Sequence, residues 1–233
     1  MVGRTKNTRS EGGLDFKRVM VIVPIKGLTE EGLEERKSFA RSMLSEGTTA
    51  DFVVVERGPP AIESRVDAEE AIPDVLTLAK KAEGEGYDAA IVWCASDPGV
   101  DAARELVDIP VIGPGEASRA IASILGKRVA RINPEIPVLE MRRDLDKTVV
   151  EIRGLAMEAV EREGADAFVL GCLALWGLGR RLREETGLPV VDPAEASLKM
   201  AEVAIALNLR HSRLTYPRYP PPHRRSPDRP EKA

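Results

Sequence analysis

Short apolar runs alternate with longer stretches of helical periodicity through most of the chain. Residues 18–23 (RVMVIV) form a β-branched run typical of a buried strand, whereas residues 67–85 repeat apolar positions every three to four residues, as one face of a helix does. By these criteria strands are expected at residues 18–23, 51–56, 88–94, 109–112, 128–132, 166–171 and 188–191, and helices at residues 30–46, 67–85, 116–125, 147–163 and 194–209. This order predicts an α/β fold with mainly parallel sheets flanked by helices.

An internal repeat indicates that the chain is built from two similar halves. Residues 86–94 (GYDAAIVWC) match residues 164–172 (GADAFVLGC) at an offset of 78, and residues 109–118 match residues 188–197 at an offset of 79. We therefore predict two similar lobes, related by a pseudo-twofold axis, with the active site in the cleft between them. The predicted boundaries are residues 16–113 plus 193–210 for the first lobe, residues 114–192 for a shortened second lobe, and disordered tails at residues 1–15 and 211–233.

Composition narrows the functional classes. The formal net charge of −4 argues against a nucleic-acid-binding domain, and the basic, Pro/Arg-rich tail is expected to be solvated rather than to bind a partner. No apolar run reaches the roughly 18 residues of a membrane helix, and the N-terminal stretch lacks the apolar segment of a secretory signal. With two cysteines no disulfide scaffold is expected, so we predict a cytoplasmic protein. The absence of Gln and the scarcity of Asn fit a thermophile.

The two cysteines are the strongest candidates for chemistry. Cys94 and Cys172 occupy matching positions of the repeat, each just past a buried strand, and open α/β sheets bind ligands at the carboxyl ends of their strands. If the lobes face each other, the two thiols flank one cleft, where one could remove a proton from a carbon acid and the other could deliver one to the opposite face. A thiol pKa of about 8.5 lets both protonation states coexist, and helix N-termini beside the cysteines would favour the thiolate. This scheme requires no cofactor and no metal.

Simpler interpretations of the cysteines stay open. A cysteine at the end of a strand often only fills space in the core, although matching positions in a repeat weigh against that reading. A disulfide would require Cα atoms within about 7 Å and would close the cleft. A metal site is disfavoured because the two histidines, His211 and His223, lie in or beside the C-terminal tail.

Five segments together resemble the Asp/Glu/hydantoin racemase superfamily. Residues 94–105 (CASDPGVDAARE) resemble the Cys-x-x-Asp-Pro-Gly block of hydantoin racemases and related Asp/Glu racemases. The other four segments are residues 58–64 (GPPAIES), 109–117 (IPVIGPGEA), 164–172 (GADAFVLGC) and 188–193 (LPVVDP). They follow the family's order, and the resemblance covers roughly residues 18–209.

The resemblance implies two α/β lobes, no pyridoxal phosphate, and a racemase or epimerase that acts on an amino acid or a hydantoin-like ring. By motif position Cys94 and Cys172 would be the catalytic pair. The residues expected to bind the substrate are Pro24, Ile25, Ala95, Ser96, Gly171 and Leu173. The expected partner is a small-molecule substrate, with no nucleic acid and no membrane, and a homo-oligomer is left open.

Two departures from the family bear on substrate and activity. Members usually carry an Asn-Pro-Asn/Gly-Thr-like loop after the first strand, whereas residues 23–27 read VPIKG. The segment between Gly126 and Val138 joins two regions that normally have another strand and helix between them, so a trimmed second lobe and a more open cleft are expected. Two other functions stay open: a sister decarboxylase or isomerase, and a non-catalytic small-molecule binding protein on the same fold.

Smaller motifs are predicted to be structural. Asp97 and Asp192, each followed by Pro, are expected to cap the helices that begin directly after them. Residues 113–118 (GPGEAS) match a dinucleotide-binding GxGxxG motif only in part, so that function is disfavoured. Trp93 is expected to pack in the sheet, and Trp176 either to wall an apolar pocket or to pack in the core.

Overall fold

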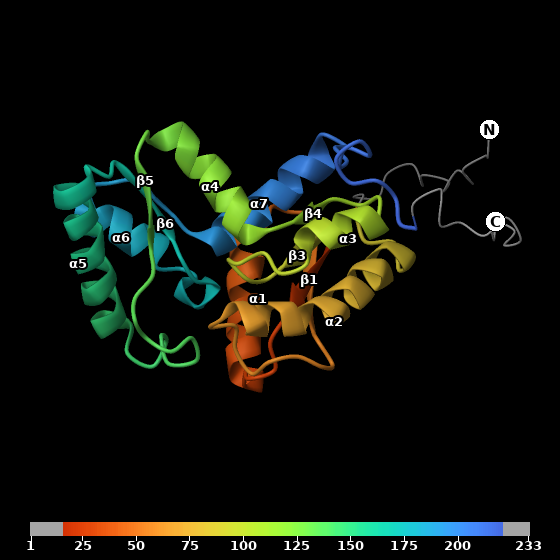
Figure 1. The fold of residues 1–233 in the computed structure, drawn as a ribbon, viewed down its shortest axis with the longest axis horizontal. Coiled ribbons are helices and arrows are strands. Elements are labelled where there is room, and N and C mark those ends of the chain that lie inside the picture. Colours follow the sequence, from red (N-terminus) through yellow and green to blue (C-terminus); the bar gives the residue numbers. More distant parts are fainter. Residues whose placement is uncertain (1–15, 221–233) are drawn as a thin grey trace, which may run out of the picture.

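The computed structural model describes residues 16–220 and contains two sheets (Figure 1). The first sheet has the order β2 (Thr48–Val54), β1 (Lys17–Val23), β3 (Ala89–Val92) and β4 (Val111–Ile112). The second has the order β5 (Val129–Ile132), β6 (Ala167–Leu170) and β7 (Val190–Val191). Every strand pair is parallel, and the predicted α/β class is confirmed.

Helices follow most strands. They are α1 (Glu30–Met43), α2 (Arg65–Gly84), α3 (Val100–Leu106), α4 (Pro114–Leu125), α5 (Leu145–Glu163), α6 (Gly179–Thr186) and α7 (Pro193–Ala206), with a 3₁₀ turn at Leu173–Leu175. The sequence pattern did not predict α3 and α6, because seven or eight residues with few apolar positions give too little periodicity to detect. Across residues 16–220, none of these helices combines the length and the apolar character that crossing a membrane requires.

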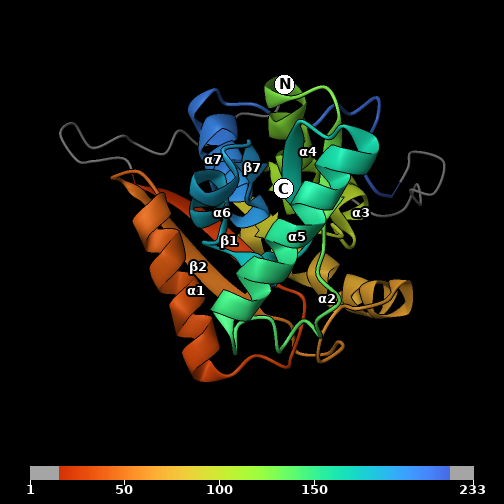
Figure 2. The same ribbon diagram turned by 90° about the vertical axis from the view of Figure 1, so that its left-hand side faces the viewer.

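The two faces of the first sheet belong to different cores because β1 alternates its side chains. Val19, Val21 and Val23 face a core that includes residues of α1 and α7, whereas Met20 and Ile22 face a core shared with α2 and α3. Figure 2 shows α1 and α2 on opposite sides of this sheet. The first sheet is therefore covered on both faces, as a parallel sheet requires.

Helices α4 and α7 join the two lobes. α4 follows the first sheet but packs against β5, β6 and β7 of the second, and α7 follows the second sheet but packs against β3 and β4 of the first. The two helices also pack against each other, and Figure 1 shows them along one side of the molecule. The strand ends of both sheets are thereby held in a fixed relation to each other.

Strand register shows which part of the repeat the second lobe lacks. In the first sheet Val19 of β1 pairs with Ala89 of β3, and α1, β2 and α2 all lie between these two strands in the sequence. In the second sheet Val129 of β5 pairs with Ala167 of β6, and only α5 lies between them. The second lobe therefore lacks the equivalents of α1 and β2. As a result β5 lies at the edge of a three-stranded sheet, while β1 is flanked by β2 in a sheet of four.

Repeated ion pairs support the equivalence of the halves. Arg104 of α3 hydrogen-bonds the backbone carbonyl of the next strand and Glu116 in the first turn of α4, at 3.0 Å. Arg183 of α6 makes the corresponding contacts, with Glu195 of α7 at 3.4 Å. The two arginines are 79 residues apart in the sequence, and so are the two glutamates. This is the offset of the second block of the sequence repeat.

The C-terminal segment requires a correction to the expected tail. Residues 211–220 lie against the first lobe: the Val111 N–H donates to His211 Nε2 at 2.8 Å, and Arg213 donates to the Arg104 carbonyl at 2.8 Å. Tyr216 shares a 3.2 Å hydrogen bond with the Arg104 guanidinium. The prediction of a disordered tail from His211 is therefore wrong for residues 211–220, because these contacts offset the loss of chain entropy. The predicted tails at residues 1–15 and 221–233 lie outside the described residues.

Candidate active site

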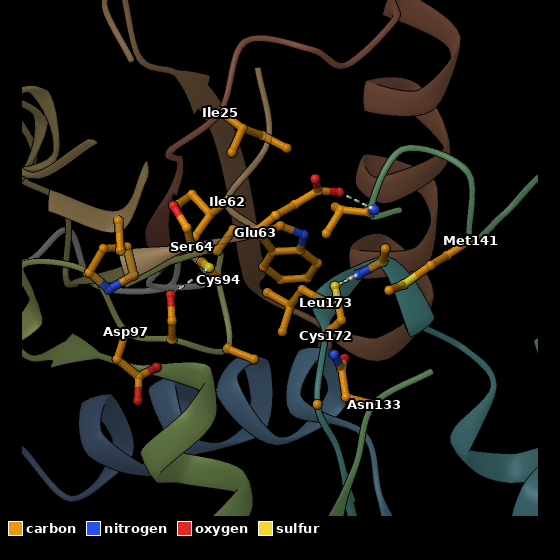
Figure 3. A pocket seen from close by; sticks show the side chains of 18 of the residues that line it. Ile25, Ile62, Glu63, Ser64, Cys94, Asp97, Asn133, Met141, Cys172 and Leu173 are labelled. Atoms are coloured by element: carbon orange, nitrogen blue, oxygen red, sulfur yellow. Dashed lines mark hydrogen bonds between the residues drawn. The ribbon is translucent and has the colours of Figure 1, made fainter. Parts of the chain in front are cut away.

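Both cysteines line one cleft between the lobes, with a volume of about 960 Å³. β3 ends at Val92 and β6 at Leu170, so each cysteine stands two residues past its strand. Figure 3 shows Cys94 and Cys172 in the same pocket, on segments from different lobes. Both are free thiols and both are half-buried. The cleft thus receives one thiol from each half of the repeat.

The two thiols have similar polar contacts. Cys94 Sγ lies 3.1 Å from the Ser96 hydroxyl, and Cys172 Sγ accepts a hydrogen bond from the Ala174 N–H at 3.4 Å. Burial raises the pKa of the Cys94 thiol, against the opposing effects of Ser96 and of the Arg131 charge. Burial also raises the pKa of Cys172, to about 11, and proximity to Cys94 adds to this rise.

The helix N-termini that were expected to favour the thiolates do not offset the effect of burial on the pKa of either cysteine. Cys172 precedes a single 3₁₀ turn, and Cys94 lies well before α3, which begins at Val100. Neither arrangement supplies enough partial positive charge to outweigh burial, which disfavours the charged form.

Asp97 does not cap the helix that follows it, which corrects the sequence prediction. α3 begins at Val100 with Gly99 as its N-cap, and the Asp97 carboxylate accepts hydrogen bonds from the N–H groups of Gly115 and Glu116, at 2.7 and 2.8 Å. Asp97 therefore caps α4, the helix after the next strand, and anchors the turn that carries Cys94. Burial raises the pKa of this carboxyl to about 6. Asp192, by contrast, caps α7 as predicted, accepting from the Ala194 N–H at 2.8 Å.

The glycines before and within α4 serve this cap. A Cβ at Gly113 would lie 2.7 Å from the Asp97 carboxyl carbon, and a Cβ at Gly115 would lie 2.2 Å from the Ala95 carbonyl oxygen. The partial GxGxxG motif is thus explained by close packing of the α4 N-terminus against the Cys94 turn.

The cleft contains most of the residues expected to bind substrate. Ile25, Ala95, Ser96, Gly171 and Leu173 line it. Pro24 does not, although it lies at the end of β1 beside them.

The two tryptophans have different places. Trp93 is buried and lines the cleft, with its ring edge toward Phe52. Trp176 packs against Phe39 and under the Arg142 guanidinium, which lies 3.6 Å from the ring centroid. Trp176 is not part of the cleft lining, so core packing describes it better than a pocket wall.

Sequence reasoning missed several polar groups in the cleft, among them Asn133, Arg131 and Arg36. Asn133 directly follows β5 and corresponds, by the equivalent registers of the two sheets, to Val23 at the end of β1; Figure 3 shows it beside Cys172. A Cβ at Gly171 would lie 2.8 Å from the Asn133 Cβ, so the glycine makes room for this side chain. The family asparagine that is absent after the first strand thus has a counterpart after β5, and the Asn-Pro pair at 133–134 was the available signal.

The loop between β5 and α5 reaches across to the first lobe. The Val138 N–H donates to the Glu63 carboxylate at 2.7 Å, and Leu139 lies against Gly27. Ile136 and Met141 from the same loop line the cleft. This loop replaces the missing strand and helix as one wall of the site.

Among residues 16–220 no group of three or more His, Cys, Asp or Glu side chains is placed to hold a metal ion. The cleft contains two thiols, the Asn133 amide and the guanidinium groups of Arg36, Arg65, Arg119 and Arg131. The structure is thus that of a two-lobed α/β protein with one cysteine from each lobe in a shared cleft.

Comparisons with known proteins identify the family. Residues 33–132 match the model of the Asp/Glu/hydantoin racemase family. A hydantoin racemase from Pseudomonas sp. (strain NS671) is 34% identical over 218 residues, covering 82% of this chain and 86% of its own, and a hydantoin racemase from Paenarthrobacter aurescens is 32% identical, covering 84% and 94%. The structure of an allantoin racemase from Klebsiella pneumoniae superposes with a TM-score of 0.78 at 28% identity, covering 86% of this chain and 94% of that one.

The chain belongs to the Asp/Glu/hydantoin racemase family. The resemblance inferred from the five segments is confirmed, and so is the prediction of a racemase at the level of the family.

Proposed function

We propose that this protein racemises a 5-substituted hydantoin or a related cyclic ureide, with Cys94 and Cys172 as its two bases and no cofactor. The observation that carries the proposal is the placement of one thiol from each lobe in a single cleft. The named activities of the relatives, hydantoin and allantoin racemisation, share a carbon acid flanked by a carbonyl and a ring nitrogen. Inversion at such a carbon requires proton transfer on both faces, which opposed thiols supply.

In the proposed reaction, one cysteine as thiolate removes the proton from the ring carbon, and the electron pair moves into the neighbouring carbonyl as an enolate. The other cysteine, as thiol, delivers its proton to the opposite face of the carbon. The two cysteines exchange protonation states in each turnover. The enzyme that has just released one enantiomer is therefore in the protonation state that converts this enantiomer back. Asn133 offers a donor and an acceptor to the ring's carbonyl and N–H groups.

The raised thiol pKa values make the proposal pH-dependent. One cysteine has to be ionised, and burial raises both pKa values above the usual range. The thiolate fraction at neutral pH is therefore small, and it grows as pH rises toward the first pKa of the coupled pair. We expect kcat/KM for racemisation to increase from pH 7 to above pH 9.

The test is deuterium incorporation at the ring carbon, followed by NMR in heavy water with each enantiomer and corrected for exchange without enzyme. Wild type is expected to exchange and racemise both enantiomers. Cys94→Ala and Cys172→Ala should each lose racemisation, because one face has no proton carrier. Each variant should still exchange the ring-carbon proton of one enantiomer without inverting it. The enantiomer that exchanges in Cys94→Ala should be the one that does not exchange in Cys172→Ala. Racemisation that persists in either variant would overturn the two-thiol assignment.

A second candidate is a binding protein that kept the fold. The raised thiol pKa values and the trimmed second sheet favour it. It predicts that a hydantoin stabilises the protein against heat while no exchange occurs at any pH up to 10, so the same samples distinguish the two functions.

A further inference from the structure

A buried cation in the cleft has no carboxylate partner. Arg36 of α1 lines the cleft and is 7% exposed. Its Nη1 donates to the Gly32 carbonyl at 2.6 Å, and within residues 16–220 no carboxylate lies within 4.0 Å of its guanidinium. Burial and the nearby Arg142 lower its pKa, to about 10, against the opposing charges of Glu35 and Cys172, and the group stays charged at neutral pH. A buried charge without a counterion is costly, so an anion that enters the cleft would relieve this cost.

A second cation enters the cleft from the other lobe. Arg131 and Asn133 lie on the face of β5 opposite to Ala130 and Ile132, which belong to the core of the second lobe. Arg131 Nη2 donates to the Gly171 carbonyl at 2.7 Å, which ties the guanidinium beside Cys172. No carboxylate of the described chain lies within ion-pair distance of it either.

The carboxylates of the cleft leave these two cations unbalanced near the thiols. Asp97 is bound by the backbone of α4, and Glu63 accepts the N–H of Val138. Glu69 and Glu135 also line the cleft, and both are exposed residues. Near Cys172 the cleft therefore carries a buried guanidinium, Arg36, and an exposed one, Arg131, and neither has a carboxylate within ion-pair distance among the described residues.

We propose that Arg36 and Arg131 form an anion subsite, so that the preferred substrate is a hydantoin whose ring substituent ends in a carboxylate. This inference rests on the proposed function and names its substrate class. With the ring carbon between the thiols, the ring substituent lies in the plane between the two faces that the thiols approach, and a carboxylate at its end would serve as the counterion of the guanidinium groups in the same cleft. Guanidinium binds carboxylate through two parallel N–H bonds, which an uncharged amide of the same shape cannot reproduce.

The experiment compares the hydantoins derived from glutamate and from glutamine, which differ only in a carboxylate against an uncharged amide. The readout is the ratio of kcat/KM for deuterium exchange on the two compounds, because effects on the thiols cancel in this ratio. Wild type should favour the acid roughly ten-fold or more, the selectivity expected from a charged hydrogen bond. Arg36→Met and Arg131→Gln should each move the ratio toward one, mainly through KM for the acid.

Arg162→Gln removes the same charge from the exposed end of α5 and should leave the ratio unchanged. Since Arg36→Met removes a buried side chain, circular dichroism checks its fold, and Arg131→Gln tests the same subsite without that risk. Exchange of the amide compound at a rate equal to or above that of the acid would overturn the anion subsite while leaving the racemase intact. Absence of exchange on both compounds and on hydantoins with apolar substituents would overturn the proposed function itself.

Discussion

Gly115 offers a sharp test of how the Cys94 turn is held. The residue is buried in the first turn of α4, and a Cβ there would lie 2.2 Å from the Ala95 carbonyl oxygen and 2.7 Å from the Asp97 carboxylate. Both contacts are far inside van der Waals distance, and the first is to backbone, so Gly115→Ala forces α4 and the Cys94 turn apart. Overpacking of this kind typically costs about 1–3 kcal/mol. The rate of deuterium exchange should also fall, because displacing a reacting group by about 1 Å can lower a catalytic rate on the order of a hundred-fold.

Gly154 provides the matched control. It lies exposed within α5, and a Cβ there meets nothing within 4 Å, so Gly154→Ala should stabilise the protein by about 0.5–1 kcal/mol. Urea unfolding measures both free energies, and deuterium exchange at saturating substrate measures the active-site effect. If Gly115→Ala unfolds at the same urea concentration as wild type and exchanges at the same rate, the packing of α4 on the Cys94 turn does not position the thiol.

Three further predictions concern other parts of the molecule. Burial, with the nearby Glu195, raises the pKa of Asp192 to about 7, so its protonation stabilises the fold as pH falls. Lowering the pH from 8 to 5 should stabilise wild type relative to Asp192→Asn by about 1–3 kcal/mol in urea unfolding, and a pH-independent difference would contradict this. Arg213→Ala should cost about 1–3 kcal/mol by freeing residues 211–220, whereas Leu214→Ala, at a 97% exposed residue, should cost nothing measurable. Glu63→Ala should raise KM several-fold by freeing the cleft loop, and an equal effect of Glu69→Ala would show that charge alone is responsible.

Much of the fold was accessible from the sequence because β1, β3, β4, β6 and β7 contain continuous apolar runs. Parallel sheets covered on both faces require such runs, and the repeat then showed that the two strand-end cysteines are equivalent. The repeat was informative because it compares two parts of one chain and needs no alignment.

The missed features depend on contacts that no local pattern records. The role of Asp97 depends on the N–H groups of Gly115 and Glu116, on a helix beyond the next strand, and its adjacent Pro gave a misleading cap signal. Arg36 has the spacing of a solvated helix residue, yet it is 7% exposed because the second lobe lies over it. The raised thiol pKa values follow from burial, which depends on how the two lobes pack together.

The missing segment of the second lobe explains where the polar groups of the cleft come from. In the first sheet, Val21 and Val23 face a core that contains residues of α1, and the residues at the equivalent positions of the second sheet are Arg131 and Asn133. The second lobe lacks the helix that corresponds to α1, so this face of β5 is open and can carry a guanidinium and an amide without burying them. Removal of a structural unit has thus turned one core face into part of the cleft wall. The proposed anion subsite depends on this open face, because a side chain packed in a core at this position could not bring the charge of Arg131 to the cleft.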